Sequence, residues 1–417
     1  MRRAPFGTNP AVGLVGTTTQ RSILTAALAV FAERGFHDTK VELITEAAGC
    51  SRPAFYQYFA SKEDVFWRLA GHLGRELATV ADHLDPIPPD QAGIAVLDRW
   101  LDELIDLHES YRPIFVSFPA AFRDTAPDQP VPRSLPERLE QVLATGNHLG
   151  GAESTVLAET TGTVVLRAIH YWMLGLFSIP RARFTRALAA TVHRLTHGPI
   201  TGVNLDPLVD PPPHAVPPWP SAPTGRPDRP LRTRGVETRQ RLLDAAGQVL
   251  PRRGYHNTRV DDIVEAAGRS HGSFYRYFET TDHLFAELAL EAGSQMAELV
   301  DAFPSGPGPD LHEWLTRWFA AYRANGGIIS AWQEIGLDNP VMTRLSQEIV
   351  LVFLDRLARL VATRGFGDTA GDAIVLLAVI ERLPYSVVVM DELDEPAAIT
   401  AAQHLIERGL LGASPPS

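Results

Sequence analysis

Cysteine is almost absent from this chain of 417 residues, in which Cys50 is the single example. One cysteine excludes a disulfide framework and a zinc site built from cysteines, so the cytoplasm is the expected compartment. Long hydrophobic runs are also missing, and the first residues give no sign of a signal peptide. The most apolar stretch, residues 164–179, is interrupted by Arg167 and His170, which favours a buried helix over a membrane span.

Signatures of catalysis are missing too. The sequence has no phosphate-binding loop, no zinc-protease motif and no nucleophile elbow. His193 and His197 have the spacing of a metal-binding pair on a helix, but no third ligand lies near them in the sequence. We therefore expect no enzyme, no metal site and no cofactor.

Charge is mixed in sign, with an acidic excess. The 38 Lys and Arg residues stand against 49 Asp and Glu residues, which gives a formal net charge of −11. This balance argues against a protein that coats nucleic acid indiscriminately. A small basic face on an acidic body remains compatible with it, because binding depends on the local patch.

An internal repeat is the dominant feature of the sequence. Residues 19–70 align without gaps to residues 238–289, and more than two fifths of the paired positions hold the same residue. This period is far longer than that of solenoid repeats, so we interpret the repeat as a tandem pair of domains.

A proline-rich segment lies between the two copies, with ten prolines in residues 207–230. Such a segment cannot form the core of a helix bundle or sheet. It is interpreted as a plain linker, with a docking site for a proline-reading partner as the alternative. The expected division of the chain is an N-terminal arm (1–18), a first repeat domain (19–70), a first C-terminal domain (71–203), the linker (204–231), a second repeat domain (232–289) and a second C-terminal domain (290–417).

The pattern of each copy predicts helices only, so the expected fold class is all-α. Gly35 is expected to end the first helix in a left-handed conformation. Thr39, with Glu42 three residues later, predicts a capping box for the second helix, and Ser51 and Ser61 are expected to cap the third and fourth. The second copy repeats this plan at Gly254, Thr258, Gly268, Ser270 and Thr280.

Two short helices joined by a glycine-containing turn predict a helix-turn-helix, whose second helix can enter the major groove of DNA. In the first copy this helix covers residues 52–59. Phe55 and Phe59 lie one turn apart and must face the core, which leaves Arg52, Tyr56 and Gln57 near the outer surface. A guanidinium, a phenol and an amide suit base edges and phosphates.

The string Ala-Ala-Gly-x-Ser-x-x-x-Phe-Tyr-x-Tyr-Phe occurs in both copies and resembles the N-terminal domain of the TetR/AcrR family of transcriptional regulators. That resemblance implies a three-helix DNA-binding domain followed by a helical ligand-binding and dimerisation domain, here twice in one chain. In the first copy it implies DNA contacts at Thr39, Lys40, Ser51, Arg52, Pro53, Ala54, Tyr56, Gln57, Tyr58 and Lys62. In the second copy the matching positions are Thr258, Arg259, Ser270, His271, Gly272, Ser273, Tyr275, Arg276 and Tyr277. Thr281 replaces the lysine, which removes one charged phosphate contact.

Aromatic residues are frequent in both C-terminal regions. Clefts rich in aromatics bind apolar ligands, whereas the ordinary alternative is a buried core. The candidate ligand-binding residues are Trp100, Phe115, Phe118, Phe122, Tyr171, Trp172, Trp314, Trp318, Tyr322, Trp332, Glu334 and Tyr385. Glu381 is a further carboxylate among apolar neighbours.

These features together predict a DNA-binding regulator. We expect it to be a repressor that a small apolar effector releases from operator DNA. The alternative is a ligand-binding or protein-interaction module in which one helix-turn-helix has lost DNA binding. The TetR resemblance implies pairing of the last helices of each lobe, so residues 154–197 and 369–409 are expected to form an intramolecular pseudo-dimer. Pairing of like lobes between two chains is the competing arrangement.

Overall fold

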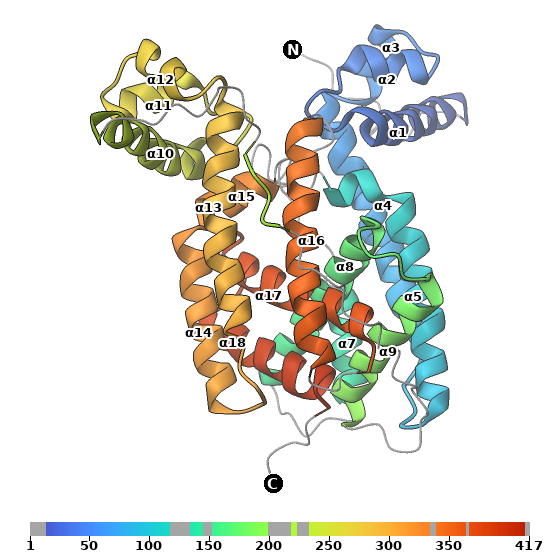
Figure 1. Cartoon of the computed structure of the whole chain (residues 1–417). Coiled ribbons are helices and arrows are strands. Elements are labelled where there is room, and N and C mark those ends of the chain that lie inside the picture. The colour runs from blue at the N-terminus through green and yellow to red at the C-terminus, as the bar shows by residue number, and fades with distance from the viewer. Residues whose placement is uncertain are drawn as a thin grey trace.

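The computed structural model describes residues 14–116, 134–144, 152–198, 218–222, 233–333, 339–363 and 367–412. These ranges contain helices and no β-strand, in agreement with the all-α prediction. Two small head domains lie at one end of a helical body, and the C-terminus lies at the opposite end (Figure 1). None of the described helices is both long and apolar enough to cross a membrane.

The two lobes follow the same order of helices. The first lobe contains α1 (Leu14–Arg34), α2 (Val41–Ala47), α3 (Arg52–Tyr58), α4 (Lys62–Asp82), α5 (Gln91–Ser110), α7 (Ser134–Ala144), α8 (Ala152–Met173) and α9 (Arg181–His197). The second contains α10 (Thr233–Arg253), α11 (Val260–Ala267), α12 (His271–Tyr277), α13 (Thr281–Asp301), α14 (Pro309–Ala324), α15 (Gly326–Gln333), α16 (Pro340–Ala362), α17 (Thr369–Val388), α18 (Glu395–His404) and the π-helix η2 (Leu405–Leu410).

Helix boundaries in the heads follow mostly from local sequence. Gly35 ends α1 with φ at +77°, a conformation that a side chain would strain. The Oγ atoms of Ser51 and Ser61 each accept a hydrogen bond from a main-chain N–H in the first turn of α3 and α4, at 3.3 Å. Ser270 and Thr280 cap α12 and α13 in the same way. These four predicted caps are confirmed.

The predicted cap at Thr39 is wrong. Helix α2 starts one residue later, with Lys40 at the N-cap, and Thr39 is only 2% exposed. Its hydroxyl donates to the carbonyl of Gly35 at 2.6 Å, and Thr258 makes the same bond to Gly254. The threonine therefore closes the turn after the first helix of each head, because a buried hydroxyl needs an internal partner.

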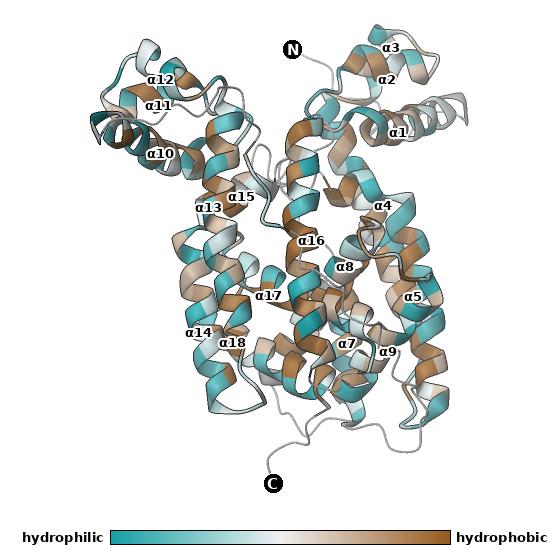
Figure 2. Ribbon diagram, in the orientation of Figure 1, coloured by the Kyte–Doolittle hydropathy of each residue, from teal (hydrophilic) through white to brown (hydrophobic). Residues whose placement is uncertain are grey.

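The body has one hydrophobic core that both lobes share. A single cluster of buried side chains runs from Ala81 to Leu195 in the first lobe and from Met296 to Leu410 in the second. Each head has a separate core of its own. Hydrophobic residues of the body helices face one another, while polar residues cover the outer faces (Figure 2). The C-terminal parts of the two lobes are thus one packed unit.

Helices α8 and α9 pack directly against α17, α18 and η2 across the boundary between the lobes. Glycine permits the closest approach. A Cβ atom at Gly371 of α17 would lie 2.5 Å from the Cβ of Ala187 in α9, which no real side chain tolerates. Larger residues at this position would force the lobes apart.

Two details of the structure concern the expected arm and linker. Helix α1 begins at Leu14, so the last residues of the expected arm are helical. Within the expected linker, residues 218–222 are described, and Trp219 packs against Phe353 and beside Gly293 of the second lobe. The rest of the linker lies outside the described residues.

Candidate nucleic-acid interface and interlobe cavity

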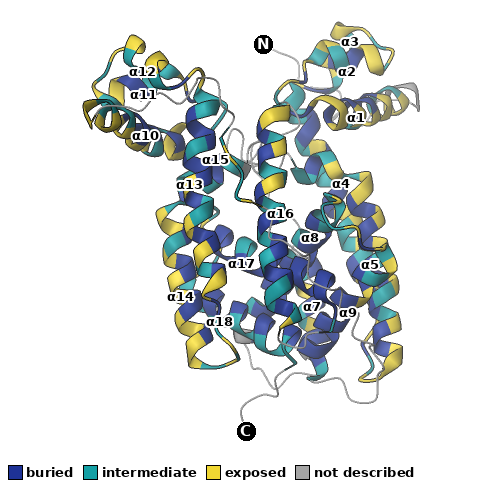
Figure 3. Cartoon of the chain, in the orientation of Figure 1, coloured by how far each residue is buried: buried dark blue, intermediate teal, exposed yellow. Residues whose placement is uncertain are grey.

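The second helix of each helix-turn-helix, α3 or α12, presents the same pattern of exposure. Phe55 and Phe274 are fully buried, whereas Tyr56 and Tyr275 are 44% and 48% exposed. The neighbouring positions of the two helices also match. Arg52, Pro53 and Gln57 are exposed in α3, and His271, Gly272 and Arg276 are exposed in α12. Figure 3 shows these exposed faces at the end of the molecule away from the body. Both helices are therefore free to meet a groove of DNA.

A carboxylate of the preceding helix contacts the first residue of each recognition helix. Arg52 lies 2.7 Å from the carboxylate of Glu42 in α2, and its Nη2 also donates to the hydroxyl of Tyr56 at 3.5 Å. In the second head, His271 lies 2.7 Å from Asp261, which occupies the matching position of α11. Both pairs are exposed, so DNA can replace the carboxylate at little cost.

Some of the expected phosphate contacts have a different partner in this structure. The hydroxyls of Thr39 and Thr258 are buried and donate to main-chain carbonyls. The Nζ atom of Lys62 donates to the carbonyls of Phe36 and His37 at 2.7 and 2.8 Å. These three side chains stabilise the turn after the first helix, and their phosphate contacts stay predictions.

We expect Arg52→Ala to weaken operator binding by ~1–3 kcal/mol and to relax specificity at one base pair, because a guanidinium reads a base edge. Tyr56→Phe should weaken binding evenly across sequences, because a phosphate contact carries no base information. Binding curves against operator variants measure both effects. Arg317→Ala, at an exposed site on α14, is the control. Wild-type binding by both head variants, with the fold intact, would refute the assignment.

The two heads touch through one pair of histidines. His37 and His256 occupy the same position of the repeat, and their rings stack with centroids 3.7 Å apart. The pKa of His37 is lowered to about 3, mainly by burial and to a smaller extent by His256 and Lys62. His37 is therefore neutral at physiological pH, and the stack does not bring like charges together. The sequence offered one signal for this contact, the histidine present in both copies.

A cavity of about 750 Å³ lies between the lobes beneath the heads. Its walls include α1, α8, α15, α16 and α17, so both lobes and the first head contribute. Of the candidate ligand-binding residues, those that line it are Phe115, Tyr171, Trp318, Tyr322 and Trp332. Such a volume is typical of ligand-binding pockets.

Four other candidates within the described residues do not line this cavity. Trp100 and Trp314 are buried and donate to the carbonyls of Val80 and Leu299. Trp172 stacks on Phe184, and the ring of Tyr385 lies beside Arg382. These four aromatic residues are core, in line with the ordinary alternative. Phe118, Phe122 and Glu334 lie outside the described residues.

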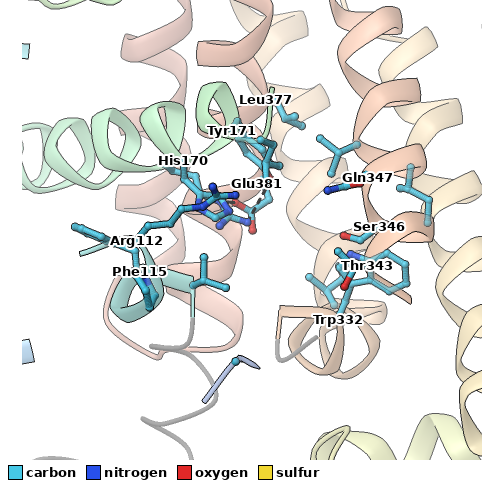
Figure 4. A pocket seen from close by; sticks show the side chains of 18 of the residues that line it. Arg112, Phe115, His170, Tyr171, Trp332, Thr343, Ser346, Gln347, Leu377 and Glu381 are labelled. Carbon is cyan, nitrogen blue, oxygen red and sulfur yellow. Dashed lines mark hydrogen bonds and ion pairs between the residues drawn. The ribbon is translucent and has the colours of Figure 1, made fainter. Parts of the chain in front are cut away.

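A buried ion pair between the lobes forms one wall of the cavity. Nε of Arg167 in α8 donates to Oε2 of Glu381 in α17 at 2.7 Å, and Nη2 of Arg167 donates to the hydroxyl of Tyr171. Burial raises the pKa of Tyr171 and lowers that of the adjacent His170, so both are neutral. Figure 4 shows His170, Tyr171 and Glu381 together on this side.

Sequence reasoning missed several cavity residues. Arg167 was visible only as an interruption of an apolar stretch, and Arg112, Ser346 and Gln347 gave no signal. Ser346 and Gln347 lie on α16, and Figure 4 shows them across the cavity from Arg112. Each of the three becomes a candidate through its place in the fold alone.

Both repeats match the sequence model of bacterial regulatory proteins of the tetR family, at residues 23–69 and 242–288. The transcriptional regulator YdgC of Bacillus subtilis is 39% identical over 72 residues, or 17% of this chain and 37% of YdgC. The transcriptional repressor AcnR of Corynebacterium diphtheriae is 34% identical over 124 residues, or 26% of this chain and 64% of AcnR. The chain thus spans less than two thirds of the length of these relatives.

A solved tetR-family regulator from Streptomyces coelicolor is 22% identical, with 44% of this chain and 82% of that chain covered at a TM-score of 0.33. The two matches of the family model fall on the two copies of the repeat. The chain therefore has a tandem TetR-like arrangement, in which a helix-turn-helix domain similar to that of tetR-family bacterial regulatory proteins occurs twice.

Proposed function

We propose that this chain is a DNA-binding transcriptional regulator whose two lobes act as a pseudo-dimer within one molecule. The observation that carries the proposal is the unequal distribution of charge across the interface between the lobes. In its ion pairs, the first lobe supplies the cation and the second lobe supplies the carboxylate.

The central pair is Arg167 with Glu381, which are 19% and 14% exposed. These residues occupy matching positions, since each lies four residues before a tyrosine, Tyr171 in α8 and Tyr385 in α17. In a pair of like lobes, Arg167 would meet a second arginine, or Glu381 a second glutamate. Burying like charges together is strongly unfavourable, so the interface favours unlike lobes.

In two further contacts the first lobe again supplies the cation. Nε of Arg183 lies 2.6 Å from the carboxylate of Asp368, the N-cap residue of α17. Arg194, only 8% exposed, donates to the carbonyl of Gly409 at 2.6 Å, and it interacts electrostatically with Asp372. Burial raises the pKa of Asp372 to about 6, against the opposing effect of Arg194.

The tandem arrangement also favours pairing within the chain. A tether holds the second lobe near the first at roughly millimolar effective concentration. The recognition helices differ, with Arg-Pro-Ala-Phe-Tyr-Gln in α3 and His-Gly-Ser-Phe-Tyr-Arg in α12. One chain should therefore prefer an operator with two unlike half-sites, about one helical turn or slightly more apart.

Light scattering on the chain bound to its operator tests the proposal. We expect one chain on one operator, because each chain already carries two paired heads. Two chains on a perfectly palindromic site would refute the pseudo-dimer. Affinity that does not fall with rising salt would favour a module without DNA-binding function, because phosphate contacts release counterions.

We further propose that the regulator is a repressor that responds to a small effector in the cavity. The cavity supports this because it contacts the first head directly and is linked to the second head through α15. Helix α1 of the first head forms part of its wall, and α15 lies against α10 of the second head, where a Cβ at Gly327 would overlap Pro251. An occupied cavity would favour a different arrangement of the heads. Reporter expression from the operator, with and without the chain, tests the sign of regulation.

A further inference from the structure

We propose that the interlobe cavity binds one small organic anion per chain, with a carboxylate on Arg112 and an apolar body between the lobes. This inference rests on the proposed function only for its effect on the heads. The binding site itself is argued from the cavity.

The size and lining of the cavity suit a largely apolar molecule. Its volume of about 750 Å³ lies within the range of ligand pockets. Apolar side chains from both lobes line it, including Leu28 and Phe115 from the first lobe and Met296, Trp332 and Phe353 from the second. Because the lining is divided between the lobes, one chain offers one such site.

The charged groups that line the cavity are Arg112, Arg167, Glu109 and Glu381. Arg167 and Glu381 neutralise each other at 2.7 Å. Arg112 has no ion pair or hydrogen bond in the described part of the chain, and the exposed Glu109 does not pair with it. Among the described residues, one guanidinium therefore lines the cavity without a hydrogen-bond partner, and a guanidinium matches a carboxylate with two parallel hydrogen bonds.

The protonation states of the neighbouring histidines are consistent with a negatively charged ligand. Burial is the main reason that the pKa values of His108 and His170 are lowered, that of His108 to about 3. Arg112 and Arg167 contribute to both shifts in the same direction. Both rings are therefore neutral at physiological pH and add no charge of their own. A ligand carboxylate would find the Arg112 guanidinium here, while Glu381 is already paired with Arg167.

The opposite wall supplies a second polar contact. Ser346 and Gln347 lie next to each other on α16, are half-buried and have no hydrogen-bond partner within the described structure. Figure 4 shows both side chains directed into the space that separates them from Arg112 and His170. A hydroxyl or carbonyl at the far end of the ligand would satisfy the Gln347 amide.

The wall that carries Gln347 is tied to the second head. Asn339 caps α16, and its Nδ2 donates to the hydroxyl of Tyr255 and to Asp282, both at 2.9 Å. Tyr255 lies in the turn that follows α10 of the second head. A ligand held between Arg112 and Gln347 would therefore contact a helix that is hydrogen-bonded to the second head.

Two fluorescent probes of nearly the same shape test the charge preference on the full chain. Anilinonaphthalene sulfonate carries one anionic group, and phenylnaphthylamine lacks it. We expect the anionic probe to bind once per chain and at least tenfold more tightly. Arg112→Gln should remove this tenfold advantage and leave the affinity of the uncharged probe within twofold.

Arg317→Gln, on the exposed face of α14 outside the cavity, is the matched control and should change neither affinity. Equal binding of the two probes, or an advantage that survives Arg112→Gln, would overturn the site. DNA binding is measured separately. A chain that binds the anionic probe as expected but fails to bind its operator refutes the proposed function and leaves the ligand site standing.

Discussion

Glu381→Arg should destabilise the chain by roughly 3–5 kcal/mol, because it leaves two buried arginines facing each other where an ion pair stood. The double variant Arg167→Glu with Glu381→Arg should recover most of that loss. The exchange preserves the local geometry as well as the charge. Arg167 donates to Tyr171 one turn later in α8, and an arginine at position 381 would have Tyr385 one turn later in α17.

Chemical denaturation of the wild type, Glu381→Arg, Arg167→Glu and the double variant measures this coupling in a double-mutant cycle. Glu313→Arg makes the same charge change at an exposed position of α14 and should alter stability by no more than about 0.5 kcal/mol. Wild-type stability for Glu381→Arg would show that the pair does not hold the lobes together. A double variant no more stable than the sum of its parts would exclude a direct interaction.

The heads could be predicted in detail because their boundaries depend on residues close in sequence. Ser51 caps a helix that starts at the next residue, and Phe55 and Phe59 reveal the buried face by their spacing alone. The failure at Thr39 has a local cause as well. A threonine before a helix can accept from the helix or donate backward to Gly35, and burial of the hydroxyl in the folded head decides the outcome.

The site between the lobes could not be predicted in the same way. Arg167 and Glu381 are 214 residues apart, so neither position indicates a partner for the other. Both tryptophans of the pair Trp314 and Trp318 are nearly fully buried, yet only Trp318 lines the cavity. Helical periodicity identifies a buried face, but it does not distinguish a face that fills a core from one that borders a cavity.

Making the two recognition helices alike should change the operator that the chain prefers. The variant His271→Arg, Gly272→Pro, Ser273→Ala and Arg276→Gln gives α12 the outer face of α3. Buried Phe274 and the cap Ser270 stay in place, and α3 already carries a proline at the same position of its first turn. The head should therefore fold as before, since every changed side chain lies on the exposed or half-buried face.

If the two heads read unlike half-sites, the variant should lose affinity for the natural operator and gain it for a palindrome of the half-site read by α3. Each mismatched base pair costs ~1–3 kcal/mol, so two mismatches predict a loss of about 30-fold or more. Competition binding between the natural site and the two possible palindromes measures the change. The reverse transplant, which gives α3 the outer face of α12, should favour the other palindrome. An unchanged preference in the first variant, with a changed preference in the reverse transplant, would mean that α12 does not read DNA and would restrict sequence recognition to the first head. An unchanged preference in both variants would refute recognition by either outer face.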